Sequence, residues 1–155
     1  MTEKARILAI DDEAGIRFFV GEALRRAGYY VAGAASGEEA LAILETEKFD
    51  LVIIDLRLKG MDGLHVLSIL RERQPEAAAI FLTAHGSLES ALEALQMGAY
   101  DYVPKPCSMK ELRATVRRAL DPNERAHRRE ALLSGLQKRG YDALESIREQ
   151  LTLVP

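Results

Sequence analysis

The sequence predicts an open α/β fold, in which a parallel sheet has helices packed on both of its faces. Short runs of consecutive aliphatic residues, such as 7–10 and 51–54, have polar residues at both ends. Such runs are typical of strands that are buried on both faces, as they are in a parallel sheet. Between the runs, apolar residues recur at the spacing of amphipathic helices. Five strand–helix units follow one another, which favours a doubly wound sheet.

The first two units can be placed by their apolar patterns and by the residues that begin or end helices. After the first strand, apolar residues three and four apart predict a helix over 16–24 that ends at Gly28. A weaker strand pattern follows at 30–34. Ser36 and Glu39 have the spacing of a capping box, so the second helix is expected to begin there.

The third unit contains the most apolar strand and a loop rich in turn-forming residues. The run 51–54 is the expected third strand, and the loop 59–63 leads to a helix over 64–70. Pro75 bounds this helix, because proline disfavours a helical conformation in the residue before it. The fourth strand is expected to end at Thr83.

The last two units complete the sheet. A helix over 88–95 is expected to end at Gly98, and the fifth strand covers 102–104. Ser108 and Glu111 form a second predicted capping box, which begins the fifth helix. The sequence therefore predicts five strands and five helices, followed by a C-terminal helical extension.

Acidic residues directly follow two of the expected strands. Asp11 and Asp12 follow the first strand, and Asp55 follows the third. The functional crevice of such a sheet lies at the carboxyl ends of its strands, so the three side chains are expected to meet there. Three neighbouring carboxylates repel one another, and a divalent cation would allow all of them to stay ionised. Oxygen ligands without a nearby cysteine or histidine indicate Mg2+ first.

A hydroxyl group and a cation are expected at the same edge of the sheet. Thr83 ends the fourth strand, and Lys105 follows the fifth. An oxygen anion carried on Asp55 would need donors of these two types to replace its hydration. The five strand-end residues therefore indicate one site, although an acid that ends a strand often only caps a turn.

With these residues, the chain resembles the receiver domains of two-component response regulators from about residue 4 to 120. The stretches 82–86 and 98–102 are similar to receivers of enhancer-dependent transcription activators of the nitrogen-regulator class. The resemblance implies a flavodoxin-like sheet with the strand order 2-1-3-4-5. Residues 121–155 would then be a C-terminal helical tail or linker.

The resemblance also implies a role for each site residue. Asp55 would be the phosphoacceptor, and the Mg2+ ion would be held by Asp12, Asp55 and the backbone carbonyl of Arg57. Asp11 would contribute to the metal site through a water molecule. Within this family, these residues would hold the ion that assists phosphoryl transfer.

Three further residues would bind the phosphoryl group or respond to it. The resemblance implies that Lys105 binds phosphate and precedes a cis peptide bond to Pro106. Thr83 would be the switch hydroxyl. Tyr102 would be the aromatic switch, although a tyrosine on the last strand can also be a plain core residue.

The leading hypothesis is a phosphorylation-dependent signalling switch that catalyses only its own phosphorylation and dephosphorylation. A sensor histidine kinase, a phosphotransfer protein or a small phosphodonor would supply the phosphoryl group to Asp55. The fourth helix, fifth strand and fifth helix would then change their common face for a downstream protein partner. The kinase and the target are not encoded in any recognisable motif.

Three other functions compete with this one. A Mg2+-dependent phosphohydrolase with an aspartyl-phosphate intermediate usually has an acid two residues after the nucleophile, where this chain has Arg57. A nucleotide-binding crevice would need a glycine-rich loop, whereas the first strand is followed by acids. A receiver-like interaction module without phosphotransfer is disfavoured by the complete set of acids, hydroxyl and lysine.

Composition limits the partners and the cellular location. The chain has 155 residues, a net charge of −3 and one cysteine, Cys107. Direct binding to nucleic acid or to an anionic membrane is not expected from this charge. No apolar stretch reaches the length of a membrane span, and no signal-peptide segment precedes the first strand, so a cytoplasmic location is expected.

The tail from residue 121 has its own pattern. The segment 121–123 reads as a break, and apolar residues at 133, 136, 144, 147 and 151 form a heptad-like seam that is interrupted at Gly140. One or two helices are expected over 124–151. They would form a homodimer contact or fold back as a hairpin, and a homodimer through the fourth and fifth helices is a further option. The tail is too short for a separate output domain, so the chain acts through protein contacts or is part of a longer regulator.

Overall fold

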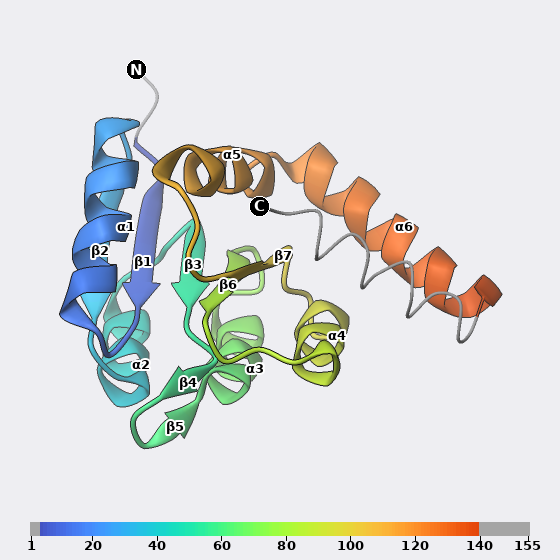
Figure 1. The fold of residues 1–155 in the computed structure, drawn as a ribbon, viewed down its shortest axis with the longest axis horizontal. Coiled ribbons are helices and arrows are strands. Elements are labelled where there is room, and N and C mark those ends of the chain that lie inside the picture. The colour runs from blue at the N-terminus through green and yellow to red at the C-terminus, as the bar shows by residue number, and fades with distance from the viewer. Residues whose placement is uncertain (1–3, 140–155) are drawn as a thin grey trace.

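Five parallel strands form the central sheet of the computed structural model, which describes residues 4–139 (Figure 1). The strand order in space is β2-β1-β3-β6-β7. With β4 and β5 set aside, this order is the expected 2-1-3-4-5, so the predicted fold class is confirmed. The strands are β1 (Arg6–Ile10), β2 (Tyr30–Ala34), β3 (Leu51–Ile54), β6 (Ala78–Thr83) and β7 (Asp101–Pro104).

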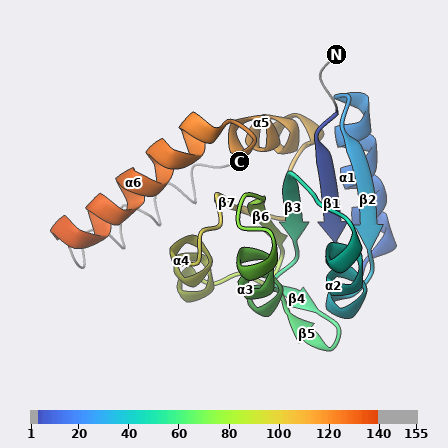
Figure 2. The same ribbon diagram turned by 180° about the vertical axis from the view of Figure 1, so that it is seen from behind.

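Helices cover both faces of the sheet, as Figures 1 and 2 show. Helices α1 and α5 pack on one face, and α2, α3 and α4 pack on the other. A sixth helix, α6, follows α5 and extends away from the sheet. The helices are α1 (Ala14–Arg26), α2 (Gly37–Thr46), α3 (Gly63–Arg73), α4 (Leu88–Gln96), α5 (Met109–Ala119) and α6 (Pro122–Arg139).

The two hydrophobic cores follow from the alternation of side chains along each strand. In β1, Ile7 and Ala9 face α1 and α5, whereas Leu8 and Ile10 face α2, α3 and α4. All four residues of β3 are buried for the same reason. A strand in the middle of such a sheet has no polar face, which explains the uninterrupted aliphatic runs in the sequence.

Several predicted helix ends are confirmed. Ser108 and Glu111 form the expected capping box of α5. Gly28 and Gly98 follow α1 and α4 with positive φ angles of 95° and 96°, a conformation that glycine adopts without strain. At α2, the hydroxyl of Ser36 accepts a hydrogen bond from the N–H of Glu39, as expected, but the Glu39 carboxylate accepts from Ala35 instead of the cap residue.

The loop after β3 contains an unpredicted element. Strands β4 (Arg57–Leu58) and β5 (Met61–Asp62) pair antiparallel within the segment that the sequence indicates as a loop. Gly60 has a φ of 75° at the tip of this hairpin. Two-residue strands are too short for an alternating pattern to appear in the sequence, so turn residues were the only available signal.

The tail is helical as far as it is described, because α6 runs to Arg139. The predicted helix over 124–151 is therefore present up to that residue. The apolar positions 133 and 136 of the expected seam lie on α6, whereas Gly140 and the positions 144, 147 and 151 lie outside the described residues. Among residues 4–139, no helix is both long and apolar enough to cross a membrane.

A buried glutamine after α3 forms hydrogen bonds with the end of α2 and with the segment that leads into β3. Gln74, just after α3, is 9% exposed. Its side-chain oxygen accepts a hydrogen bond from the N–H of Phe49 at 2.9 Å. Its amide nitrogen donates to the carbonyl oxygens of Leu44 at 3.0 Å and Glu47 at 2.8 Å. One side chain thus satisfies three backbone groups that would otherwise lack a partner.

Replacing Gln74 with leucine should therefore destabilise the fold strongly. The variant keeps a similar volume but leaves three backbone groups without their partner, and each buried unsatisfied group costs about 1–3 kcal/mol. We expect the free energy of unfolding to fall by about 3 kcal/mol in urea titrations. Gln96→Leu, which changes an exposed glutamine at the end of α4, is the matched control and should shift it by less than about 0.5 kcal/mol. A loss below about 1 kcal/mol for Gln74→Leu would contradict the assigned role.

Candidate functional site

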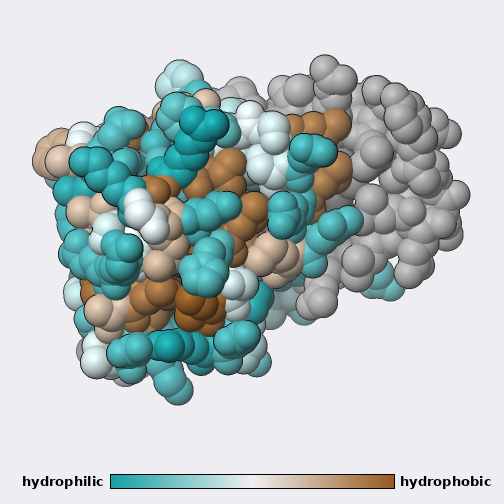
Figure 3. Space-filling model, turned by 90° about the horizontal axis from the view of Figure 1, so that it is seen from below, coloured by the Kyte–Doolittle hydropathy of each residue, from teal (hydrophilic) through white to brown (hydrophobic). Residues whose placement is uncertain are grey.

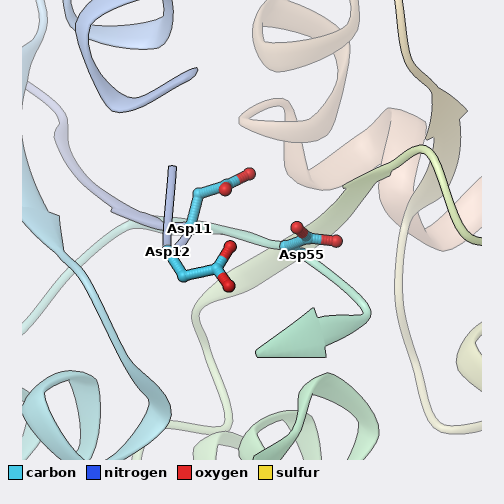
Figure 4. A group of neighbouring side chains, drawn as sticks. All are labelled: Asp11, Asp12 and Asp55. Carbon is cyan, nitrogen blue, oxygen red and sulfur yellow. The ribbon is translucent and has the colours of Figure 1, made fainter. Parts of the chain in front are cut away.

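Asp11, Asp12 and Asp55 lie together at the carboxyl ends of β1 and β3 (Figure 4). One carboxylate oxygen from each residue lies within 4.8 Å of the others. Asp11 and Asp55 are 4% and 3% exposed, whereas Asp12 is exposed to solvent. The N–H of Asp55 donates to the carbonyl oxygen of Ile10 at 3.0 Å, which fixes the ends of the two strands side by side. The structure thus brings together the three acids expected at this edge.

Lys105 supplies a cation to the two buried acids. Its ammonium group donates to a carboxylate oxygen of Asp11 at 2.8 Å and to one of Asp55 at 3.3 Å. The Lys105 side chain is only 11% exposed. Its backbone N–H donates to the carbonyl oxygen of Thr83 at 3.0 Å, and the peptide bond to Pro106 is cis, as the resemblance implied.

Burial and charge act in opposite directions on this pair. Burial raises the pKa of Asp11 above its ordinary value, and the hydrogen bonds from Lys105 and from the N–H of Glu13 only partly offset that effect. Burial also opposes the charged form of Lys105, but the bonds and charges of Asp11 and Asp55 outweigh it, so the pKa of the ammonium is raised. Lys105 therefore stays a cation over the whole neutral range.

An arginine that the sequence analysis missed also holds the acidic strand end. Arg17, on α1, donates to the backbone carbonyl oxygen of Asp11 at 2.6 Å. Its side chain lies near Gly33 in β2, where a Cβ would come to 3.4 Å from it. The only available signal was a basic residue in the turn of α1 that follows the two acids, which is too common a pattern to be diagnostic.

Thr83 ends β6, as predicted, and Arg57 lies two residues after Asp55 at the start of β4. Thr83 is 1% exposed, and its hydroxyl oxygen accepts a hydrogen bond from the N–H of His85 at 3.1 Å. Arg57 begins β4, and its N–H points to a carboxylate oxygen of Asp55 at 3.4 Å. The backbone after Asp55 therefore turns back toward the acid, which brings the Arg57 peptide group close to the site.

Tyr102 is buried between the sheet and α4. It is 6% exposed, and its ring stacks on Phe81 with the ring centroids 6.1 Å apart. Its hydroxyl lies 3.3 Å from the hydroxyl of Ser90, and a Cβ at Gly86 would overlap the tyrosine oxygen. Burial raises the pKa of the Tyr102 hydroxyl. Gly86 and Ser90 thus shape the position of this ring, and the sequence analysis assigned a role to neither.

The donor set fits a hard divalent cation. Among residues 4–139, Lys105 is the only cation that forms ion pairs with these acids. If all four groups are ionised, the three carboxylates and the Lys105 ammonium have a net charge of −2. Oxygen donors from carboxylates and a backbone carbonyl are the ligands that Mg2+ prefers. Asp55 also carries a nucleophilic oxygen next to Lys105, which could stabilise a second anion at the same place.

The three acids lie at the face formed by the carboxyl ends of the strands. Figure 3 views the molecule from below Figure 1, where the arrowheads of the strands point. Hydrophilic residues cover much of this face, and hydrophobic residues form smaller areas between them. Of the three acids, Asp12 is the one exposed to solvent, so a charged group could reach the cluster at that residue.

Comparison with known protein families gives one match over most of the chain. The model of the response regulator receiver domain family matches residues 7–117. Among curated proteins, the alginate biosynthesis transcriptional regulatory protein AlgB of Pseudomonas aeruginosa is 39% identical over 144 residues, which cover 93% of this chain and 32% of AlgB. The DNA-binding transcriptional regulator NtrC of Salmonella typhimurium is 37% identical over 118 residues, or 76% of this chain and 25% of NtrC.

Solved structures give the same result. A CheY-like response regulator receiver domain from Methanospirillum hungatei has a TM-score of 0.75 and 31% identity, and covers 81% of this chain and 98% of its own. NtrX from Brucella abortus has a TM-score of 0.73 and 32% identity, with 86% of this chain and 31% of NtrX covered. The chain spans a third or less of the length of AlgB and NtrC.

The close approach of Gly86 and Tyr102 gives a test of the buried ring position. In Gly86→Ala, the new methyl group would occupy the place of the tyrosine hydroxyl, so we expect the ring to turn outward. Because burial raises the pKa of Tyr102, exposure should lower this pKa toward its ordinary value, as measured by NMR titration of the tyrosine ring carbons.

Two controls accompany this titration. Tyr102→Phe assigns the resonance, and Gly15→Ala adds a methyl group where nothing lies within 4 Å. An unchanged Tyr102 titration in Gly86→Ala would mean that the loop moves and the ring does not, which would contradict the prediction.

Proposed function

Because the chain belongs to the family of response regulator receiver domains, we propose that it is a phosphorylation switch with Asp55 as its phosphoacceptor. The similarity to NtrC also confirms the likeness to receivers of the nitrogen-regulator class. The observation that carries the proposal is the pairing of Lys105 with both Asp11 and Asp55 inside an acidic site. A buried nucleophilic carboxylate beside a cation is suited to receive an anionic group.

Phosphoryl transfer would proceed by attack of a carboxylate oxygen of Asp55 on phosphorus. The new oxygen–phosphorus bond makes Asp55 an acyl phosphate. The bond between phosphorus and the donor nitrogen of a phosphohistidine breaks, and the leaving imidazole keeps the electron pair of that bond. The Lys105 ammonium already lies 3.3 Å from an oxygen of Asp55 and would stabilise the charge on the transferred group. A bound Mg2+ would supply further neutralisation of that charge.

We assign the metal ligands from the hydrogen bonds and the solvent exposure of each acid. Asp11 accepts hydrogen bonds from Lys105 at 2.8 Å and from the N–H of Glu13 at 3.0 Å, both shorter than the 3.3 and 3.4 Å bonds that Asp55 accepts, and this firmer engagement supports contact through water. Asp12 is exposed and lies within reach of Asp55. Asp12, Asp55 and the backbone carbonyl of Arg57 would therefore bind Mg2+ directly.

Thr83 and Tyr102 would convert the modification into a change of shape. The Thr83 hydroxyl would exchange its bond with the N–H of His85 for one to the new phosphoryl oxygens. Tyr102 is buried beside α4, so we propose that this movement favours its buried position over an outward one. The common face of α4, β7 and α5 would then be presented to a downstream protein.

The wider role is proposed from the family. A sensor histidine kinase or phosphotransfer protein would be the phosphodonor, in the cytoplasm. Residues 4–120 would form the receiver unit, and residues 121–155 would form a helical tail or linker that contributes no direct DNA contact. Phosphorylation and dephosphorylation of Asp55 would be the only reactions that the chain catalyses.

Asp55 should be the only residue that is modified by acetyl phosphate in the presence of Mg2+. We expect an acid-labile phosphoryl group on the parent protein, detected by intact mass, and none on Asp55→Asn. Asp62→Asn is the matched control, because asparagine can also cap α3, and it should be labelled like the parent. Labelling of Asp55→Asn, or phosphate on a serine or threonine, would refute the assignment. No labelling of any variant would favour an interaction module without phosphotransfer.

The two neighbouring acids should differ in their effect on Mg2+ binding. We expect Asp12→Ala to weaken Mg2+ binding by at least about tenfold, because a direct ligand is lost, and Asp11→Ala to weaken it less. Calorimetric titration of the apo protein measures both affinities. Glu13→Ala removes an equal charge from the same exposed turn and should have the smallest effect. Equal affinities in all variants would exclude the metal site, and a larger loss in Asp11→Ala would reverse the assigned ligands.

A further inference from the structure

A buried carboxylate outside the phosphorylation site connects Tyr102 to the C-terminal helix. Asp101 lies at the start of β7 and is 1% exposed. Its oxygen Oδ1 accepts a hydrogen bond from the backbone N–H of Tyr102 at 2.8 Å. The same oxygen accepts one from the guanidinium of Arg128, on α6, at 3.2 Å. One carboxylate oxygen thus bonds both the proposed switch residue and the helix that leaves the domain.

Two arginines on α6 contact the body of the domain. The guanidinium of Arg128 also lies over the ring of Tyr100, 5.1 Å from its centroid. Arg125, one turn earlier, donates to the backbone carbonyl oxygen of Glu76 at 2.9 Å. These residues are three apart, so they lie on the same side of α6. Beyond them, α6 runs away from the sheet (Figures 1 and 2).

Two opposing effects determine how strongly Arg128 holds α6 to Asp101. Removing Arg128 would leave a buried carboxylate with the Tyr102 N–H as its main partner, which is costly. Burial raises the pKa of Asp101, and the charge of Arg128 acts against this effect. In both arginines, however, the Nε atom is buried without a hydrogen-bond partner. Each unsatisfied buried donor offsets part of the stabilisation that the ion pair provides.

We propose that Asp101 is a docking site for α6 and that it links the attachment of this helix to the state of Tyr102. The inference rests on the proposed function, because Tyr102 is the connection to Asp55. The described conformation combines a buried Tyr102 with a docked α6. Phosphorylation of Asp55, which favours the buried ring, therefore strengthens the docking of α6, and docking in turn favours the phosphorylated state.

The test compares amide hydrogen exchange of residues 122–130 in the full chain before and after treatment with acetyl phosphate and Mg2+. We expect exchange in the parent to slow by at least about fivefold on phosphorylation, the lower end of typical coupling between sites. In Arg128→Gln, exchange should be faster than in the parent and should no longer respond to phosphorylation. Arg117→Gln removes an exposed arginine from α5 and should behave like the parent.

A second variant separates docking from folding. Asp101→Asn keeps an acceptor for the N–H of Tyr102 but removes the charge that attracts Arg128, so it should also release α6. The double variant with Arg128→Gln should be no more exchange-prone than either single variant, because both changes remove the same contact. Additive effects of the two changes would overturn the assigned pair.

Mass spectrometry of Asp55 on the same samples distinguishes the two proposals. If Asp55 is labelled in parent and Arg128→Gln, but α6 exchange is equal in both proteins, the docking site is refuted and the phosphorylation switch stands. If Arg128→Gln releases α6 but phosphorylation leaves the hydrogen exchange of residues 122–130 in the parent unchanged, the link to Tyr102 is refuted. If Asp55 is not labelled at all, the proposed function fails and the link fails with it.

Discussion

The site depends on the burial of two like charges at the ends of neighbouring strands. Parallel pairing of β1 with β3 places Asp11 beside Asp55, and helices on both faces of the sheet keep water from most of their surface. Two buried carboxylates whose oxygens lie within 4.8 Å of each other require a cation nearby. Lys105 provides it from the end of β7, the edge strand of the sheet. The cluster still carries excess negative charge, which makes it receptive to a metal ion.

The surrounding backbone is packed tightly enough to fix these charges. Gly63, at the start of α3, lies so close to the chain after β3 that a Cβ there would overlap the carbonyl oxygen of Asp55. The N–H of Gly63 also donates to the carbonyl oxygen of Leu56 at 2.8 Å. Asp55 is therefore held by the sheet on one side and by the first turn of α3 on the other. Such support limits the positions available to its carboxylate.

The sequence was sufficient for the features that depend on local pattern. The aliphatic runs and the capping residues predicted the five sheet strands and five helices, and the strand ends predicted where Asp11, Asp55 and Lys105 would meet. The resemblance to a known family supplied the order of the strands. All of these features repeat along the chain or stand at a fixed place in a strand–helix unit.

Features that depend on contacts between distant segments escaped sequence analysis. Gln74 bonds residues 25 to 30 positions away, and Asp101 bonds Arg128, 27 positions away. Neither spacing follows from helix or strand periodicity. Between residues 122 and 139, α6 has 18 residues and hence a length of about 27 Å. The contacts that Arg125 and Arg128 make with the domain lie near the beginning of this helix, so a tilt of about 10° there would move its far end by about 5 Å. A rearrangement no larger than the loss of one ion pair could in this way be amplified into a displacement the size of a helical turn.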